Sequence, residues 1–181
     1  MKLLCLDLDG VMHPANDAIQ LNRAAAGMIS GPMLSAQMKS QGRFVWLPHL
    51  RAALEGSQDL QILIHSTWRS IYADRVMRDL LEDLSHLVVS TDGQFENRAD
   101  MTHDEYIAAA CELVNPEEVL VIDDRPEMFN GGLVGLLNAR LRFLWCDPER
   151  GLSDPATSSQ LHTWALHTTE GHARTAPPVT A

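Results

Sequence analysis

The sequence is short of positive charge and of long apolar runs. Its 14 lysines and arginines stand against 24 acidic residues, which gives a formal net charge of −10. Strong nonspecific binding to nucleic acid needs a basic surface, so this balance disfavours it, although a local basic groove stays open. No apolar run approaches the roughly 20 residues that span a bilayer, so no membrane partner is expected. No charged-then-apolar leader precedes the first apolar run, and we expect a cytoplasmic protein.

Cysteine is scarce as well. Cys5, Cys111 and Cys146 form no metal-ligand pattern, and no pairing histidine or basic motif stands beside any of them. A catalytic cysteine is therefore not expected. Cys5 and Cys146 fall in apolar runs, which predicts small buried side chains in a reducing compartment.

What is present is the composition of a folded globular protein. Hydrophobic residues make up 45% and charged residues 21% of 181 residues, enough for one domain with a real core. We expect that domain over residues 1–170. Within it, residues 14–47 are punctuated by proline and glycine and predict an irregular flap or mini-cap. Residues 171–181 predict a disordered tail.

Short apolar runs alternate with helical patterns along the chain. This alternation predicts an α/β fold, with a parallel sheet covered by helices on both faces. A Thr-x-x-Glu capping box at Thr102 predicts the start of one helix, which would run to Val114. The expected strands are residues 3–6, 61–65, 87–90, 118–122 and 141–146, and the other expected helices lie near 24–29, 47–56, 71–84, 133–137 and 157–167.

The first apolar run leads into Asp7 and Asp9, which are followed by Gly10. Side chains alternate along a strand, so the two carboxylates should leave it on the same side. Two such carboxylates repel each other unless a cation lies between them, and a hard cation with oxygen ligands fits that role. One carboxylate could instead be a nucleophile and its neighbour a general acid. The alternative is a surface turn, because Asp-Gly is a common turn pair.

Two further strand ends carry polar chemistry. Ser66 and Thr67 follow the second run, where a hydroxyl can bind phosphate or cap the next helix. Arg69 is a candidate anion ligand there, or a solvated surface charge. Asp123 and Asp124 follow the run at 118–122, where a loop rarely needs two adjacent carboxylates, and they would complete a metal site. Ligands bind beyond the carboxyl ends of parallel strands, so all three ends should converge.

These motifs, in this order, resemble the haloacid dehalogenase-like (HAD) superfamily. The resemblance rests on Asp-Leu-Asp-Gly-Val at 7–11, a hydroxyl after the second strand and an acidic pair after a later one. Ser-Thr-Trp-Arg at 66–69, Phe-x-Trp-x-Pro at 44–48 and Ile-Asp-Asp at 122–124 are similar to the small HAD domains of bacterial Swiss army knife RNA-repair proteins. The implied fold is a Rossmannoid three-layer sandwich with a five-stranded, mostly parallel sheet and a minimal cap or none.

The resemblance implies a phosphatase. Asp7 would attack the phosphoryl group, Asp9 would act as general acid and then base, and Ser66 would bind the transferring group. Mg²⁺ would be held by Asp7, the backbone carbonyl of Asp9, and Asp123 or Asp124. An open site would admit a bulky phosphomonoester such as an RNA or DNA end.

The sequence departs from the family at its third motif. A lysine or arginine is expected near the start of the helix at Thr102, and none stands there. Arg98 is the best substitute, followed by Arg69 and His103. The gap supports an alternative function, a catalytically weak HAD fold that binds or regulates. A receiver domain is a further alternative, but its phospho-acceptor would follow the third strand, where Ser90 leads only into Thr91-Asp92, and its late lysine is missing.

Overall fold

A computed structural model describes residues 1–15, 31–91, 93–95, 100–137 and 140–167. Within these ranges the chain forms one parallel sheet of four strands in the order β2-β1-β3-β4. The strands are β1 (Lys2–Leu6), β2 (Leu60–Ile64), β3 (Glu118–Asp123) and β4 (Leu141–Trp145). The predicted α/β fold with a parallel sheet is confirmed, but the sheet has four strands and not five.

The missing strand is the one predicted over 87–90. The chain is still in a 3₁₀ helix up to Leu87, and Val88 then forms one isolated bridge with Ile62. The N–H of Val89 donates to the Ile62 carbonyl at 2.8 Å, but the ladder stops there. The Asp74 carboxylate accepts hydrogen bonds from both the N–H and the hydroxyl of Thr91, which holds the chain outside the sheet. The apolar run at 87–90 predicts a strand, but the contact between Asp74 and Thr91 follows the single bridge to β2 and the ladder goes no further.

Helices fill the connections between the strands. The helix predicted from its capping box is present: the Thr102 hydroxyl accepts from the Glu105 N–H at 3.3 Å, and the Glu105 carboxylate accepts from the Thr102 N–H at 2.9 Å. The helix expected over 71–84 is shorter, because a 3₁₀ helix replaces its last part. Within the described ranges, no helix is both long and apolar enough to cross a bilayer. The helices are α2 (Gly31–Ser40), α3 (Leu47–Leu54), α4 (Asp74–Leu80), α5 (His103–Val114), α6 (Gly132–Leu137) and α7 (Pro155–Leu166).

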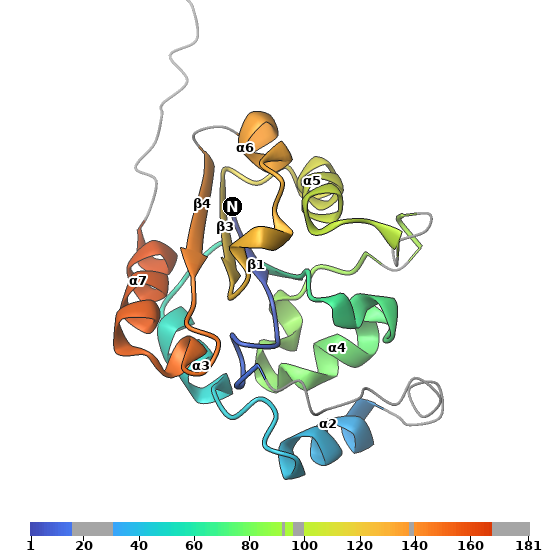
Figure 1. Cartoon of the computed structure of the whole chain (residues 1–181), viewed down its shortest axis with the longest axis vertical. Helices are drawn as coiled ribbons and strands as arrows, with labels where there is room; N and C mark the ends of the chain where they lie inside the picture. Colours follow the sequence, from blue (N-terminus) through green and yellow to red (C-terminus); the bar gives the residue numbers. More distant parts are fainter. Residues whose placement is uncertain (16–30, 92, 96–99, 138–139, 168–181) are drawn as a thin grey trace, which may run out of the picture.

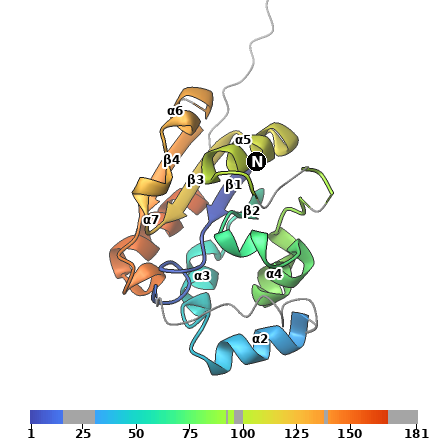
Figure 2. The same cartoon turned by 45° about the vertical axis from the view of Figure 1, so that its right-hand side comes forward.

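The sheet is the middle of three layers. Odd-numbered side chains of β1 and β3, such as Cys5 and Val121, pack in one cluster with residues of α5 and α6. Even-numbered side chains, such as Leu6 and Ile122, pack in a second cluster with residues of α3, α4 and α7. Figures 1 and 2 show these two groups of helices on opposite faces of the sheet. The period of two along each strand therefore decides which helix a side chain meets.

The segment between the first two strands holds more structure than predicted. Helix α2 lies beside α4 at one end of the molecule (Figures 1 and 2), and Met38, Phe44 and Trp46 join the main core cluster. The helix predicted near 24–29 and the tail predicted at 171–181 lie outside the described residues. The role of 14–47 as a lid or mini-cap stays a prediction.

Lys2 links the first strand to the last helix. Its side chain is buried, and its ammonium donates to the carbonyls of Trp164 at 2.6 Å, of Ala165 at 3.1 Å and of His167. The last carbonyls of a helix have no partner within the helix, and a cation there also complements the helix dipole. Strand β1 is thereby fixed against the carboxyl end of α7.

Candidate active site

Three carboxylates meet at the carboxyl end of the two central strands. Asp7 follows β1, Asp123 ends β3 and Asp124 comes next. One oxygen from each lies within 4.8 Å of the others. The structure thus brings together Asp7, Asp123 and Asp124, which the sequence predicted as metal ligands; we call them the acidic trio.

Gly10 makes room for one member of this trio. Its φ of +72° lies in the left-handed region, and a Cβ built on it would come within 2.4 Å of the Asp124 Cγ. A side chain at this position would therefore be strained and would also displace the Asp124 carboxylate. The glycine of the first motif lets the loop after β1 approach Asp124 closely.

The acidic trio carries more negative charge than its surroundings balance. Asp7 is buried, and neither of its oxygens makes a hydrogen bond of ordinary geometry within the described chain. Burial, reinforced by the charge of Asp123, raises the pKa of Asp7 well above its usual value. Burial and Asp123 likewise raise the pKa of Asp124 to about 6. Buried carboxylate oxygens without partners fit a hard cation such as Mg²⁺, which prefers oxygen ligands.

Asp9 has the opposite environment, although it is only two residues from Asp7. Its carboxylate accepts hydrogen bonds from His13 Nε2 at 2.9 Å, Arg43 Nη1 at 3.0 Å and Trp68 Nε1 at 2.7 Å. Burial alone would raise the pKa of Asp9, but the hydrogen bonds from His13 and Trp68 and the charge of Arg43 outweigh it and lower the pKa. The Asp9 carboxylate is not part of the acidic trio; its predicted contact with Mg²⁺ is through its backbone carbonyl.

The donors to Asp9 are fixed by their own neighbours. His13 Nδ1 accepts from the Phe44 N–H at 3.5 Å, so the ring proton is on Nε2, which faces Asp9. The indole of Trp68 is fully buried, and its N–H makes the shortest of the three contacts with Asp9. His13 and Arg43 were missed because neither lies in a recognisable motif.

Ser66 and Thr67 stand at the carboxyl end of β2. Ser66 is buried, and its hydroxyl caps a short 3₁₀ helix by accepting from the Trp68 N–H at 3.5 Å. The same hydroxyl also acts on Asp7, where it lowers the pKa against the larger effect of burial. Thr67 is exposed at the start of that helix. The capping role is present, and phosphate binding by this pair stays a prediction.

Arg69 connects two parts of the site. Its guanidinium donates to the carbonyls of His65 at 2.7 Å, Ser66 at 3.2 Å and Met101 at 2.5 Å, and it lies 4.9 Å from the Tyr106 ring centroid. It therefore joins the end of β2 to the residues before α5. Arg98, the preferred substitute for the third motif, lies outside the described residues. Phosphate binding by either arginine stays a prediction.

Two histidines complete the buried end of the sheet. His65 follows β2, and His103 is the first residue of α5. His65 Nε2 and His103 Nδ1 each lie 3.8 Å from Asp123 Oδ2, and the rings meet edge to face with centroids 5.2 Å apart. Burial lowers the pKa of His65 to about 3, so this ring is neutral.

The alternation of side chains along the strands, combined with the strand register, places His65 and Asp123 next to Asp7. Cys5 pairs in register with both Leu63 and Val121, so two residues further on Asp7, His65 and Asp123 come level on the face that α5 covers. From the sequence, His103 was only a substitute for the lysine or arginine of the third motif, and no role was predicted for His65.

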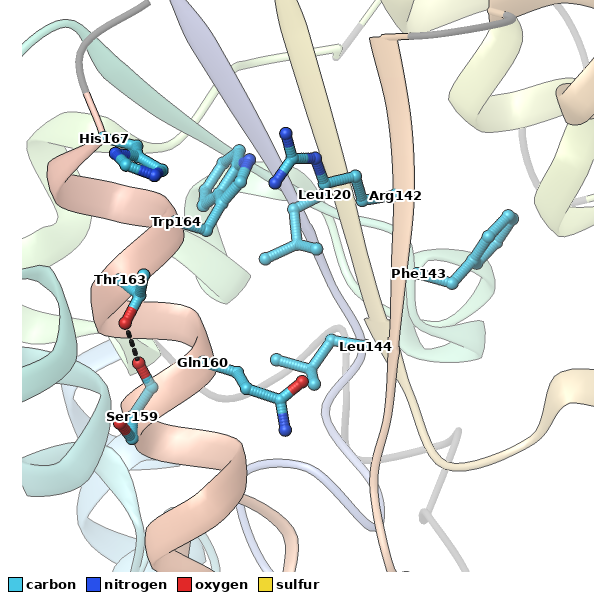
Figure 3. A pocket seen from close by; sticks show the side chains of 9 residues that line it. All are labelled: Leu120, Arg142, Phe143, Leu144, Ser159, Gln160, Thr163, Trp164 and His167. Atoms are coloured by element: carbon cyan, nitrogen blue, oxygen red, sulfur yellow. Dashed lines mark hydrogen bonds between the residues drawn. The ribbon is translucent and has the colours of Figure 1, made fainter.

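A separate hollow lies between β4 and α7 (Figure 3). None of the predicted site residues lines it, and the Thr163 hydroxyl there donates to the Ser159 carbonyl at 2.8 Å. It lacks any cluster of carboxylates, so we place the chemistry at the acidic trio. Its lining residues are Leu120, Arg142, Phe143, Leu144, Ser159, Gln160, Thr163, Trp164 and His167.

Comparison with known families decides what this arrangement is. The family described as "HAD domain in Swiss Army Knife RNA repair proteins" matches residues 3–157. The chain belongs to this family. The match runs from β1 into α7, so it includes all three polar strand ends, and it confirms the resemblance seen in the motifs. The chain is therefore a HAD-like hydrolase domain, which sets the receiver-domain alternative aside. No curated protein and no solved structure matches it.

Proposed function

We propose that this HAD domain is a Mg²⁺-dependent phosphatase that forms a phosphoaspartyl intermediate on Asp7. The observation that carries the proposal is the acidic trio: three carboxylates gathered at the carboxyl end of the central strands, with the Asp7 oxygens buried and without a hydrogen bond of ordinary geometry from the described residues. A buried carboxylate without partners is costly as a structural element. It is suited to a nucleophile whose partners are an ion and a substrate.

Asp7, Asp123 and Asp124 would hold the ion, together with the backbone carbonyl of Asp9. Bound there, Mg²⁺ would offset the repulsion between the Asp7 carboxylate and the phosphate oxygens. The donor set is consistent with that ion because every ligand is an oxygen.

In the first half of the reaction an Asp7 oxygen attacks phosphorus in line, and the bond between phosphorus and the leaving oxygen breaks. Asp9 gives its proton to that oxygen. Asp9 is ionised in the free protein, because its donors lower its pKa. A phosphate dianion bound next to it would raise that pKa and favour the protonated form that the acid step needs.

In the second half the ionised Asp9 takes a proton from water. The water oxygen attacks phosphorus of the aspartyl phosphate, inorganic phosphate leaves, and the Asp7 carboxylate is restored. The ring of donors around Asp9 suits this half, because it stabilises the ionised form.

The substrate we favour is a bulky phosphomonoester such as an RNA or DNA end. Trp145 pairs in register with Asp123 and is 41% exposed. It stacks on Phe143, with ring centroids 4.8 Å apart, and it contacts Phe129 at 5.5 Å. Aromatic side chains of this kind can stack a nucleobase. The net charge of −10 opposes binding along the backbone of a nucleic acid, so we favour the terminal phosphate of an RNA or DNA chain as the substrate.

A catalytically weak HAD fold that binds or regulates is the second candidate. Within the described residues, neither Asp7 nor Asp123 forms an ion pair with lysine or arginine; the partners of Asp123 are histidines, and Arg125 lies 3.8 Å from Asp124. Phosphate charge would then be balanced less well than in a site with a lysine.

The test is hydrolysis of an aryl phosphate with and without Mg²⁺. We expect Mg²⁺-dependent turnover that Asp7→Asn reduces by about 10⁴-fold or more, while the exposed control Asp79→Asn keeps the wild-type rate. Equal rates in wild type and Asp7→Asn would contradict the mechanism. No turnover in any variant, also on a 3′-phosphorylated oligonucleotide, would favour the binding module.

A further inference from the structure

A second group of possible ligands lies beside the acidic trio. His65, His103 and Asp123 come from the ends of β2 and β3 and the start of α5, and they are 0%, 3% and 0% exposed. One atom from each lies within 4.8 Å of the others. The proposed phosphatase mechanism uses neither histidine.

These side chains lack hydrogen bonds of ordinary geometry. Within the described chain, no ring nitrogen of His65 or His103 makes such a bond, and neither does Asp123 Oδ2. The other oxygen of Asp123 is occupied, because it accepts from the Arg125 N–H at 2.7 Å. Buried polar groups are nearly always hydrogen-bonded or bound to an ion, so a cluster of five unpartnered atoms needs an explanation.

The spacing of the atoms fits an ion better than it fits hydrogen bonds. Each histidine nitrogen lies 3.8 Å from Asp123 Oδ2, which is beyond hydrogen-bond range. Two atoms bound to one zinc-class ion, each about 2.1 Å from it, are at most about 4.2 Å apart. The two 3.8 Å pairs satisfy that limit as they stand. The three ligand atoms all lie within 4.8 Å of one another, close to the same limit.

The ligand types select the ion. The acidic trio offers only oxygen, which suits Mg²⁺, whereas two imidazoles and a carboxylate suit zinc and neighbouring transition metals. Phe129 packs edge to face against both rings, with centroids at 6.0 Å from His65 and 5.8 Å from His103. Such an apolar wall limits water access and holds the rings in orientation.

We propose that His65, His103 and Asp123 form a second cation site, for a transition-metal ion of the zinc class, which shares Asp123 with the acidic trio. An ion there places positive charge beside Asp7, because Asp123 is common to both groups. The histidines would then supply, through a metal ion, the charge that a lysine gives other members of the superfamily.

The test uses Co²⁺ as a visible probe in protein saturated with Mg²⁺. Nitrogen ligands in a low-coordinate site give cobalt strong absorption bands, whereas an all-oxygen octahedral site gives weak ones. We expect one equivalent of Co²⁺ to produce strong bands in wild type. His65→Gln and His103→Gln should each weaken binding by at least about tenfold, and the exposed control His49→Gln should leave it unchanged. Absence of strong bands in wild type, or cobalt binding as tight as in wild type in both ligand variants, would overturn the proposal.

A measurement on wild type covers the case in which a variant fails to fold. Zn²⁺ added to ¹⁵N-labelled protein should shift the imidazole nitrogens of His65 and His103 and leave those of His49 in place. If neither buried ring responds, the site does not bind zinc. Asp7→Asn separates this proposal from the phosphatase: it removes turnover, but it should keep the cobalt bands because Asp7 is not a ligand of the second site.

Discussion

Two carboxylates leave the same strand end two residues apart, and the fold treats them in opposite ways. The Asp9 carboxylate receives three hydrogen bonds, from an imidazole, a guanidinium and an indole. The Asp7 carboxylate is more deeply buried and receives none of ordinary geometry from the described residues. A group that carries protons can be held by donors in the free protein, whereas a nucleophile must keep its oxygens available. We call Asp9 and its three donors the satisfied half of the site, and the acidic trio the unsatisfied half.

After the loss of turnover expected for Asp7→Asn, the next largest effect comes from Asp9. Asp9→Asn should lower turnover by about 10²–10⁴-fold, the usual contribution of general acid–base catalysis. It should also destabilise the fold by about 1–3 kcal/mol, because the NH₂ group of asparagine cannot accept the hydrogen bonds that the Asp9 carboxylate accepts. Aryl phosphate kinetics and urea unfolding measure the two losses. A variant that loses activity but none of its stability would show that the three hydrogen bonds are energetically neutral.

Mg²⁺ should act on the unsatisfied half. At about a hundredfold excess over its dissociation constant, a bound ion adds about 2.7 kcal/mol of stability, seen as a rise in thermal midpoint that a chelator reverses. Asp124→Asn should lose most of that gain, and Asp79→Asn and Arg43→Met should keep it. An equal gain in Asp124→Asn would place the ion elsewhere.

Most substitutions in a buried site lower the free energy of unfolding, whereas Asp7→Asn should raise it. In chelator at neutral pH we expect the variant to be more stable than wild type by about 1–3 kcal/mol, because it removes a carboxylate whose ionised form is penalised by burial and by the charge of Asp123. Urea unfolding measures the change, with Asp79→Asn expected within about 0.5 kcal/mol of wild type. A loss of stability would mean that Asp7 has partners which the geometry does not reveal.

The smallest effect concerns the pKa of Asp9. Arg43→Met removes one of the contributions that outweigh burial, so that pKa should rise. Because the folded pKa is lowered, the ionised group stabilises the protein fully above the unfolded value of about 3.9, and this stabilisation is lost as pH falls through the folded pKa. In Arg43→Met the total stabilisation should be smaller, and its loss should be complete at a higher pH than in wild type.

Carboxyl-carbon NMR across an acid titration follows Asp9 directly. Arg51→Met is the matched control, because Arg51 donates to Asp83 at 2.7 Å and not to Asp9. An unchanged pKa in Arg43→Met would assign the lowering to His13 and Trp68 alone.

The strand ends were predictable because a short apolar run followed by two acidic residues is typical of a buried strand that ends at a polar site. Asp7, Asp123 and Asp124 were placed together from parallel-sheet geometry alone, and the structure has them within reach of one another. The capping box at Thr102 was equally local and equally reliable. The run at 87–90 misled because its fate depends on the Asp74–Thr91 contact, which local pattern does not contain.

The surroundings of the acids were less accessible. Arg43 reaches Asp9 across 34 positions of sequence, through a segment without a regular period. The His65 and His103 pairing needs both the register of β2 and the seating of α5 over the odd-numbered face. Such contacts are set by how helices pack on the sheet, and a single sequence does not state that packing.

The hydrogen bonds of Lys2 join segments that are far apart in the sequence, and this has a consequence for folding during synthesis. β1 carries Asp7 at its end, yet it lies between β2 and β3, and its first residue is held by carbonyls at the end of α7. During synthesis β1 is made before α7, so the contacts of Lys2 can form only after both elements are available. The carboxylate of Asp7 is therefore synthesised well before the contacts that fix its strand against α7 can form.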